Sequence, residues 1–285
     1  MTATEWLIDA PDSHRPDTRG YRLSLATSAD EVRAARVLRD GVFADENYGT
    51  TTDPAGNDRD DVDDRCDHLI VWYCGNVRSP VRVGERKTAV ATIRLLPPHR
   101  NDAAPRGAGL GANRIFGLMP LESLLDSTVE VGGACVHADH RTGTAASLLW
   151  GGVARYLHLT GYRYAIGCAP VDLRDGGSNA AAFWDLVRQR HLACAERRCR
   201  ARIPVPIGGV QRADAPVVPP MLPGCLRWGA TICGPPAANE MYCTAEFLVL
   251  LDLQGADRRY LRRFLGVGGR DEPGSPRGGP RRGVR

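Results

Sequence analysis

The hydrophobic and polar residues of this chain repeat with two periods, one typical of strands and one typical of helices. Alternating or β-branched apolar runs predict strands at residues 21–26, 68–73, 88–96, 129–137, 162–168, 200–207 and 241–251. Apolar residues spaced by three and four predict helices at residues 28–43, 118–125, 144–160, 178–190 and 257–265. This mixed order, with both hairpin-like and crossover connections, predicts an α/β (α+β) fold.

Local signals refine two of these elements. Ser28 followed three residues later by Glu31 is the capping-box pattern at the start of a helix. Gly132 and Gly133 interrupt the strand predicted at residues 129–137. Because glycines inside a strand often mark a bulge or a close backbone approach, we expect an irregularity there.

The two ends of the chain differ from its middle. Residues 1–19 are polar and contain Pro and Asp, which predicts a loose N-terminal arm. Residues 20–265 are expected to form one domain. Residues 266–285 are rich in Gly, Pro and Arg and nearly lack apolar side chains, so they are expected to be disordered. Five arginines and two acids give this tail +3 of the net charge of +4.

Composition excludes several classes of protein. The 285 residues are 43% hydrophobic and 25% charged, as in ordinary soluble proteins. The apolar run at residues 247–251 is much shorter than the ~20 residues of a membrane span. The chain has nine cysteines without a C-x-x-C pair, and its first residues show no apolar leader. These features predict a reducing cytoplasmic location. Neither a metal nor a bound cofactor is expected. With only 6% aromatic residues, no nucleic-acid partner is expected.

A predicted strand, a short polar turn and a predicted helix follow one another between residues 129 and 160. The first N–H groups of a helix have no partner within it, so a helix start attracts phosphate. Arg141 in the turn can add a charge-assisted contact. The turn matches the R-x-x-G-x-G/A pattern of GNAT acyltransferases only in part, because Thr144 stands where Gly is expected. By itself this segment is equally consistent with an ordinary strand–turn–helix.

Five motifs extend the comparison along the chain. They are LRDGVF (38–43), DRCDHLIV (64–71), ATIRLLP (91–97), EVGGACVHADHRTG (130–143) and YRYAIGCAPV (162–171). In their sequence and order the chain resembles the ornithine acyl-[acyl carrier protein] N-acyltransferase family and, more distantly, the acyl-homoserine-lactone autoinducer synthases. The resemblance runs from about Tyr21 to Phe264. It implies a GNAT-like acyltransferase fold, with a mixed central sheet flanked by helices on both faces.

The resemblance also implies an activity. A (3-hydroxy)fatty acyl group would pass from acyl carrier protein to the α-amine of L-ornithine, the first step of ornithine lipid biosynthesis. Acyl carrier protein or CoA would carry the acyl group as a co-substrate. One position departs from the family pattern E-x-G/S-R, because Gly133 replaces the arginine. Two alternatives therefore stay open: another amine acceptor, or a GNAT-like module that binds acyl donors or lipids without turnover.

Amide formation from a thioester needs a neutral amine, hydrogen-bond donors for the oxyanion and a proton for the leaving thiolate. Glu130 is the candidate general base, directly or through water, although it could instead bind the amine electrostatically. Backbone N–H groups from Gly133 to Val136 are candidate oxyanion donors. Cys135 lies in the same segment, but direct transfer needs no nucleophile, so it is expected to be a small buried hydrophobe.

Other candidate residues come from the motif positions. Substrate contacts are expected from Arg39, Phe43, Asp64, Asp67, Arg94 and Phe116, and pantetheine contacts from Val136, Arg141, Gly143, Thr144 and Ala145. By its chemistry alone, Arg39 is expected to pair with an aspartate. Arg94 lies inside an apolar strand and needs an acidic partner, for which Glu130 and Asp67 are candidates.

Charge indicates which partners the chain could bind. Residues 53–67 hold seven aspartates and two arginines, which could attract a cationic acceptor. Acyl carrier proteins are acidic, so a basic docking surface is expected. The arginines that could form it are Arg155, Arg163, Arg188 and Arg190, or Arg258, Arg259, Arg262 and Arg263. The second group and the tail could also contact anionic lipid at the inner face of the membrane.

Overall fold

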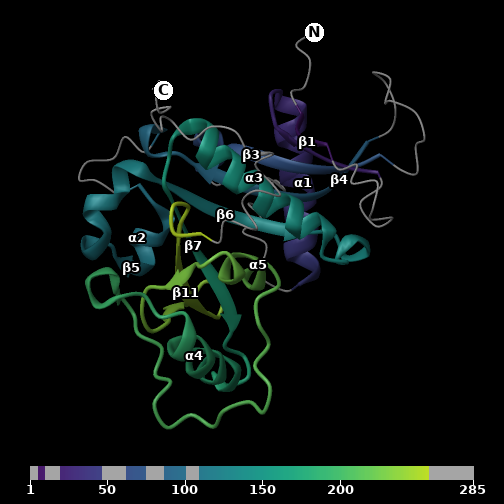
Figure 1. The fold of residues 1–285 in the computed structure, drawn as a ribbon. Coiled ribbons are helices and arrows are strands. Elements are labelled where there is room, and N and C mark those ends of the chain that lie inside the picture. The colour runs from purple at the N-terminus through teal and green to yellow at the C-terminus, as the bar shows by residue number, and fades with distance from the viewer. Residues whose placement is uncertain (1–5, 10–19, 47–61, 75–86, 101–108, 257–285) are drawn as a thin grey trace, which may run out of the picture.

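The structure, a computed structural model, describes residues 6–9, 20–46, 62–74, 87–100 and 109–256. Among these residues, nine strands form one sheet, in the order β1-β2-β3-β4-β6-β7-β11-β10, with β9 paired to β11 (Figure 1). Their bounds are β1 Trp6–Asp9, β2 Tyr21–Leu25, β3 Asp67–Tyr73, β4 Thr88–Leu96, β6 Thr128–Val136, β7 Tyr164–Asp172, β9 Thr231–Ile232, β10 Ala237–Asn239 and β11 Thr244–Asp252. A second, two-stranded sheet pairs β5 (Phe116–Gly117) with β8 (Arg200–Ala201).

Helices cover both faces of the large sheet, as the resemblance implies. The α-helices in the described ranges are α1 Ala29–Asp45, α2 Gly111–Ile115, α3 Thr144–Thr160, α4 Ser178–Arg190 and α5 Leu222–Arg227. Short 3₁₀ helices are η2 Asp63–Arg65, η3 Pro98–Arg100, η4 Met119–Ser127, η5 Ala138–His140 and η6 Ala195–Arg197. None of the helices in these ranges has the length and apolar content that crossing a membrane requires.

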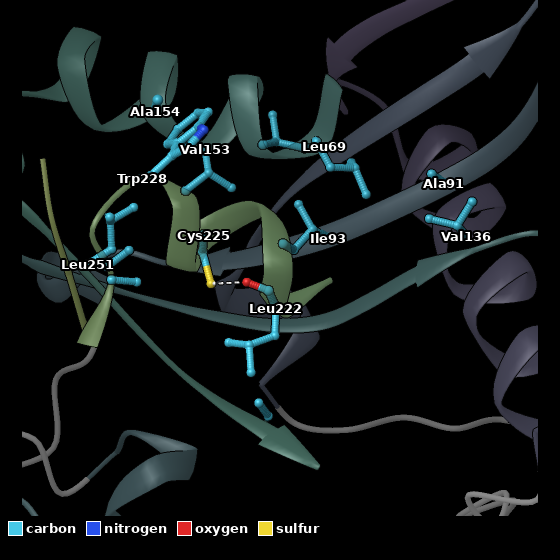
Figure 2. Close-up of a cluster of buried hydrophobic side chains, with 14 of the residues drawn as sticks. Leu69, Ala91, Ile93, Val136, Val153, Ala154, Leu222, Cys225, Trp228 and Leu251 are labelled. Carbon is cyan, nitrogen blue, oxygen red and sulfur yellow. Dashed lines mark hydrogen bonds between the residues drawn. The ribbon is translucent and has the colours of Figure 1, made fainter. Parts of the chain in front are cut away.

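Side chains that alternate across the strands divide the core into two main layers. On one face of β4, Ile93 and Leu95 share a cluster with residues of α3, α4 and α5. On the other face, Leu96 clusters with Ala112 of α2. Figure 2 shows part of the first cluster, in which Cys225 of α5 donates a hydrogen bond from Sγ to a backbone carbonyl at 3.2 Å. The mixed sheet thus has α1 and α2 on one face and α3, α4 and α5 on the other.

The start of α1 confirms the capping box. Ser28 Oγ accepts a hydrogen bond from the backbone N–H of Glu31 at 3.3 Å. The Glu31 carboxylate reaches back to the N–H of Thr27 at 2.9 Å, one residue before the usual position. This cap fixes the first turn of the helix that carries Arg39 toward the sheet.

The sequence periods predict the long elements well and the short ones poorly. Strands β2, β3, β4, β6, β7 and β11 and helices α1, α3 and α4 lie within a few residues of their predicted ranges. The strand predicted at 200–207 is wrong in extent, because only Arg200–Ala201 pair with β5. The loose arm is wrong at Trp6–Asp9, an apolar segment that forms an edge strand antiparallel to β2. The helix predicted at 257–265 and the tail at 266–285 lie outside the described residues.

Candidate active site

The site begins where two neighbouring strands separate. Strands β6 and β7 are parallel and pair only through Thr128–Glu130 and Tyr164–Ile166, after which they diverge (Figure 1). At the point of divergence, a Cβ placed on Gly167 would lie 2.6 Å from the carbonyl oxygen of Val131. Glycine at this position therefore lets the two backbones pass closely before they part.

A cavity of about 940 Å³ fills the space between the separated strands. Parts of β6, β7, α1 and α2, the turn before α3 and the β10–β11 hairpin line it. The predicted site residues in this lining are Arg39, Phe43, Arg94, Glu130, Gly133, Cys135, Val136, Arg141 and Gly143. A cavity is thus present beside the middle strand, and Glu130 lines it.

The predicted irregularity in β6 is a β-bulge opposite β4. Thr92 pairs with Cys135 and Arg94 pairs with Gly132, so the bulged strand has one residue more than its partner between these pairs. Gly133 lies inside the bulge with φ +57°, a backbone region that favours glycine. The bulge therefore removes backbone groups from the regular ladder beside the cavity.

A buried carboxylate under the cavity holds three arginines. Arg39 and Arg36 both contact Oδ2 of Asp63, and Arg94 donates to Oδ1 at 3.1 Å. The side chain of Asp63 is fully buried. Burial alone would raise the pKa of Asp63, but the charges and hydrogen bonds of Arg39 and Arg94 outweigh it and lower that pKa. The expected pairing of Arg39 with an aspartate is confirmed, and Asp63 is a partner of Arg94 that the sequence alone does not single out.

The two glycines of β6 make room for these arginines. A Cβ on Gly132 would lie 3.2 Å from Nε of Arg94, and one on Gly133 would lie 2.9 Å from Cδ of Arg39. Nη1 of Arg39 is buried and has no hydrogen-bond partner among the described residues. At position 133, where the family pattern has an arginine, this chain therefore places the guanidinium of Arg39 from α1.

Glu130 is anchored at the start of α2. Its two carboxylate oxygens accept hydrogen bonds from the backbone N–H groups of Gly111 and Ala112, at 2.9 and 2.7 Å. A carboxylate oxygen can accept more than one hydrogen bond, so Glu130 can hold α2 in place and still accept a proton or an N–H from a ligand in the cavity. This anchoring fixes the carboxylate at the point where β6 and β7 begin to diverge.

Cys135 and Cys168, two of the cysteines in the cavity lining, are poor nucleophiles. Burial raises the pKa of Cys135 to about 12, despite the nearby charge of Arg39. Burial, with the charges of Glu246 and Glu130, also raises the pKa of Cys168 in β7. A thiolate at either position would be unfavourable at neutral pH, so the cavity fits direct transfer better than a covalent intermediate.

Glu246 of β11 is a further carboxylate in the cavity lining. It is only 6% exposed. It accepts hydrogen bonds from Oγ1 of Thr244 at 2.8 Å and from Nδ2 of Asn239 at 3.4 Å. Burial raises the pKa of Glu246, and these two hydrogen bonds offset only part of that rise. The only signal in the sequence is one acid within the apolar run at 241–251.

The predicted pantetheine residues lie only partly on the cavity. Arg141 donates from Nε to the carbonyl oxygen of Val136 at 3.1 Å. Gly143, with φ +91°, directly precedes α3. Thr144 and Ala145 lie outside the described lining, and Ala145 is fully buried in the core. The part of the turn that meets the cavity is therefore the part before the helix.

Three predicted substrate residues are also placed elsewhere. Asp64, with 70% of its side chain exposed, pairs with Arg36 at the surface. Asp67 accepts a hydrogen bond from the hydroxyl of Tyr156 at 2.6 Å. Phe116 is 1% exposed and belongs to the core beside α2. Packing and local ion pairing fix these side chains, and none of the three lines the cavity.

Comparisons with known proteins find a matching family model, similar sequences and similar solved structures. The family model described as an acetyltransferase (GNAT) domain matches residues 38–151. The L-ornithine N(alpha)-acyltransferase of Rhodobacter capsulatus is 28% identical over 266 residues, which are 87% of this chain and 97% of the relative. The enzyme of the same name from Rhizobium meliloti is 27% identical, over 86% of this chain and 84% of the relative. A solved CoA-dependent acyl-homoserine lactone synthase is 16% identical, with a TM-score of 0.47 over 83% of this chain and 81% of that one.

The fold, the divergent strand pair and the family match define a GNAT-like acyltransferase. Within this class the chain is similar to the L-ornithine N(alpha)-acyltransferases over most of its length, which confirms the resemblance that the five motifs indicate.

Proposed function

We propose that this protein transfers a (3-hydroxy)fatty acyl group from acyl carrier protein to the α-amine of L-ornithine. The observation that carries the proposal is the cavity between β6 and β7, which is lined by both arginines and carboxylates. A free amino acid has an anionic and a cationic end, so it needs both kinds of group. The names of the relatives support ornithine as the acceptor.

The arginines beside the glycine pair fit the carboxylate of the acceptor. Nη1 of Arg39 is a buried donor without a partner among the described residues, and it lies against Gly133 in the cavity lining. A carboxylate at this point would satisfy the orphaned donor and gain a charge-assisted hydrogen bond. Arg39 would thus do the work expected of the family arginine that is replaced by Gly133.

The reaction itself needs only a few groups. The neutral α-amine attacks the thioester carbonyl carbon, a C–N bond forms, and the C–S bond then breaks. Glu130, directly or through water, takes the proton that the nitrogen loses. Backbone N–H groups in the bulge at Gly133–Val136 donate to the oxyanion, and the departing pantetheine thiolate takes up a proton.

The donor would enter beside the start of α3. Arg141, next to that helix start, can contact the phosphate of the pantetheine arm. Of the arginines considered for docking of acyl carrier protein, Arg163 is paired with Asp252 at 2.7 Å and Arg188 with Asp185 at 3.0 Å. The arginines at 258–263 lie outside the described residues, so their contact with acyl carrier protein or with the membrane surface stays a prediction.

Reconstitution tests the proposal. The full-length protein is incubated with 3-hydroxyacyl carrier protein, or with the matching acyl-CoA, and with a panel of amino acids that includes ornithine. Mass spectrometry is expected to detect Nα-acylornithine, with the carrier-protein donor preferred. Acylation of another amino acid in place of ornithine would reassign the acceptor, and no amide with any amino acid would refute the enzymatic proposal.

Two variants then test Glu130. Glu130→Gln keeps the shape of the side chain and removes its basicity, so the rate is expected to fall by roughly 10²–10⁴-fold. Glu122, an exposed acid in η4, provides the control, and Glu122→Gln is expected to leave the rate unchanged. An unchanged rate in Glu130→Gln would show that Glu130 is not the general base.

A further inference from the structure

Glu246 differs from Asp63 and Glu130 in the partners that hold its carboxylate. Asp63 is surrounded by three arginines, and both oxygens of Glu130 are held by backbone N–H groups. Both hydrogen bonds of Glu246 from the described residues reach the same oxygen, Oε1. Its Oε2 has no hydrogen-bond partner in those parts of the chain, and no arginine or lysine there forms an ion pair with it. A nearly buried carboxylate is thus left on the cavity wall without a cation.

We infer that Glu246 binds the side-chain ammonium of the acceptor and thereby selects a diamino acid; this inference rests on the proposed function. Glu246 lies on the same face of the sheet as Leu248 and Leu250, which cluster with Ala112 of α2. Glu130, hydrogen-bonded to α2, lines the same cavity. The charges of Glu246 and Glu130 both raise the pKa of the Cys168 thiol in β7. The two carboxylates therefore lie near the same thiol.

The chemistry of an unpaired buried carboxylate favours a cation as its ligand. Removing a carboxylate from water costs free energy that a charge-assisted hydrogen bond can return. Burial raises the pKa of Glu246, and an ammonium at Oε2 would act against that rise. The donor without a partner, Nη1 of Arg39, lies elsewhere in the same lining and fits a carboxylate. Together the two groups fit a molecule with an anionic end and a distant cationic end.

A substrate pair isolates the ammonium. L-norvaline has the carbon chain of L-ornithine without the side-chain amine, so only ornithine can pair with Glu246. In Glu246→Gln, kcat/KM for ornithine is expected to fall roughly 10- to 100-fold, because one charge-assisted contact is lost. The kcat/KM for norvaline is expected to change by less than about threefold, because its contacts do not include Glu246. Glu246→Asp, which keeps the charge, is expected to retain an intermediate preference for ornithine.

Glu240 provides a matched control for charge. It is exposed in the turn between β10 and β11 and also lines the cavity. If Glu240→Gln lowers the preference for ornithine as much as Glu246→Gln does, the effect is general and the inference is overturned. An equal loss with ornithine and norvaline in Glu246→Gln would also overturn it, because Glu246 would then act on the reacting amine or on the fold. An unchanged preference for ornithine in Glu246→Gln would also overturn the inference.

Failure of the proposed function can be told apart from failure of this inference. If the wild type acylates neither substrate, it is the proposed acylation that has failed. Calorimetric binding of ornithine to the wild type and to Glu246→Gln then decides the role of Glu246 by itself. Weaker binding to the variant, with norvaline bound equally by both proteins, supports the inference, and equal binding of ornithine to both proteins overturns it.

Discussion

At the residue scale, one aspartate organises the charges of the site. Asp63 is fully buried and contacts Arg36, Arg39 and Arg94. Three guanidinium groups held this closely would repel one another without a carboxylate between them. Asp63 therefore determines where Arg39 and Arg94 lie, and through them which charges line the cavity.

Loss of the charge on Asp63 is expected to destabilise the fold. Asp63→Asn keeps the shape of the side chain but leaves the buried Arg39 and the partly buried Arg36 and Arg94 without this counter-charge. The loss is expected to cost about 3–5 kcal/mol in the free energy of unfolding. Asp64, which is exposed and pairs with Arg36, provides the control. Asp64→Asn is expected to cost less than about 1 kcal/mol. Urea denaturation measures both values, and equal values for the two variants would contradict the central role of Asp63.

The same carboxylate predicts a pH dependence of stability. The pKa of Asp63 in the folded protein lies below the ordinary value of 3.8. Its contribution to stability is therefore fully present above about pH 5 and is lost as the pH falls through 3.8 toward the folded-state pKa. Denaturation between pH 6 and pH 3 is expected to show a steeper loss of stability for the wild type than for Asp63→Asn. Parallel curves for the two proteins would assign the acid sensitivity to other groups.

The contact between Arg39 and Gly133 can be tested with a methyl group. Gly133→Ala introduces strain at φ +57° and places Cβ 2.9 Å from Cδ of Arg39. Gly161→Ala introduces similar strain at φ +77° with open space around it. The Gly133 variant is expected to lose about 1–3 kcal/mol and the Gly161 variant less, because only the first must also move Arg39. Thermal denaturation of both variants measures the difference in stability. Equal losses would mean that Arg39 moves without any further loss of stability.

The sequence predicts the types of residue at the site better than their partners. It indicates an arginine on α1 that pairs with an aspartate, and a glycine irregularity in the middle strand. It does not distinguish Asp63 from the other aspartates at 53–67, because the choice depends on which one the 3₁₀ turn η2 places under α1. Glu246 is likewise hidden in an apolar strand, since its role arises from the hairpin that brings β11 to the cavity.

At the element scale, local signals and tertiary context contribute differently. Long strands and helices carry enough periodic positions to be predicted, because each buries one face over several residues. Short elements such as α2, β5 and β10 have too few positions for a period. Their structure depends on neighbours: α2, for instance, begins where its first N–H groups meet the carboxylate of Glu130. Such contacts between distant residues are not visible in a local pattern.

The cap of α1 gives a prediction at this scale. Ser28→Ala removes the side-chain oxygen that accepts a hydrogen bond from the N–H of Glu31, so the free energy of unfolding is expected to fall by about 1 kcal/mol. Ser147, exposed within α3, is the control, and Ser147→Ala is expected to change it by less than about 0.5 kcal/mol. Chemical denaturation checks both. A loss in Ser28→Ala no larger than in the control would show that the Glu31 side chain alone caps the helix.

At the scale of the whole molecule, the divergence of β6 and β7 opens a cavity that elements on both faces of the sheet line. The cavity is lined from one side by the turn before α3 and from the other by α1 and α2. Under the proposed function, the pantetheine arm and the amino acid would be bound there together, with their reacting atoms held close. Cys135 and Cys168 in the lining do not fit a covalent carrier, because burial raises the pKa of Cys135 to about 12 and also raises that of Cys168.

This arrangement predicts a sequential kinetic mechanism. Double-reciprocal plots against acceptor, at several donor concentrations, are expected to intersect, because both substrates must be present before either product forms. Parallel lines are the pattern of an acyl-enzyme that forms before the acceptor binds. Cys135→Ala separates these mechanisms chemically: with direct transfer it is expected to keep its rate within a few-fold, whereas a covalent role would abolish turnover. Intact-protein mass spectrometry after incubation with donor alone gives a third measurement, and a stable mass increase that disappears in Cys135→Ala would overturn direct transfer.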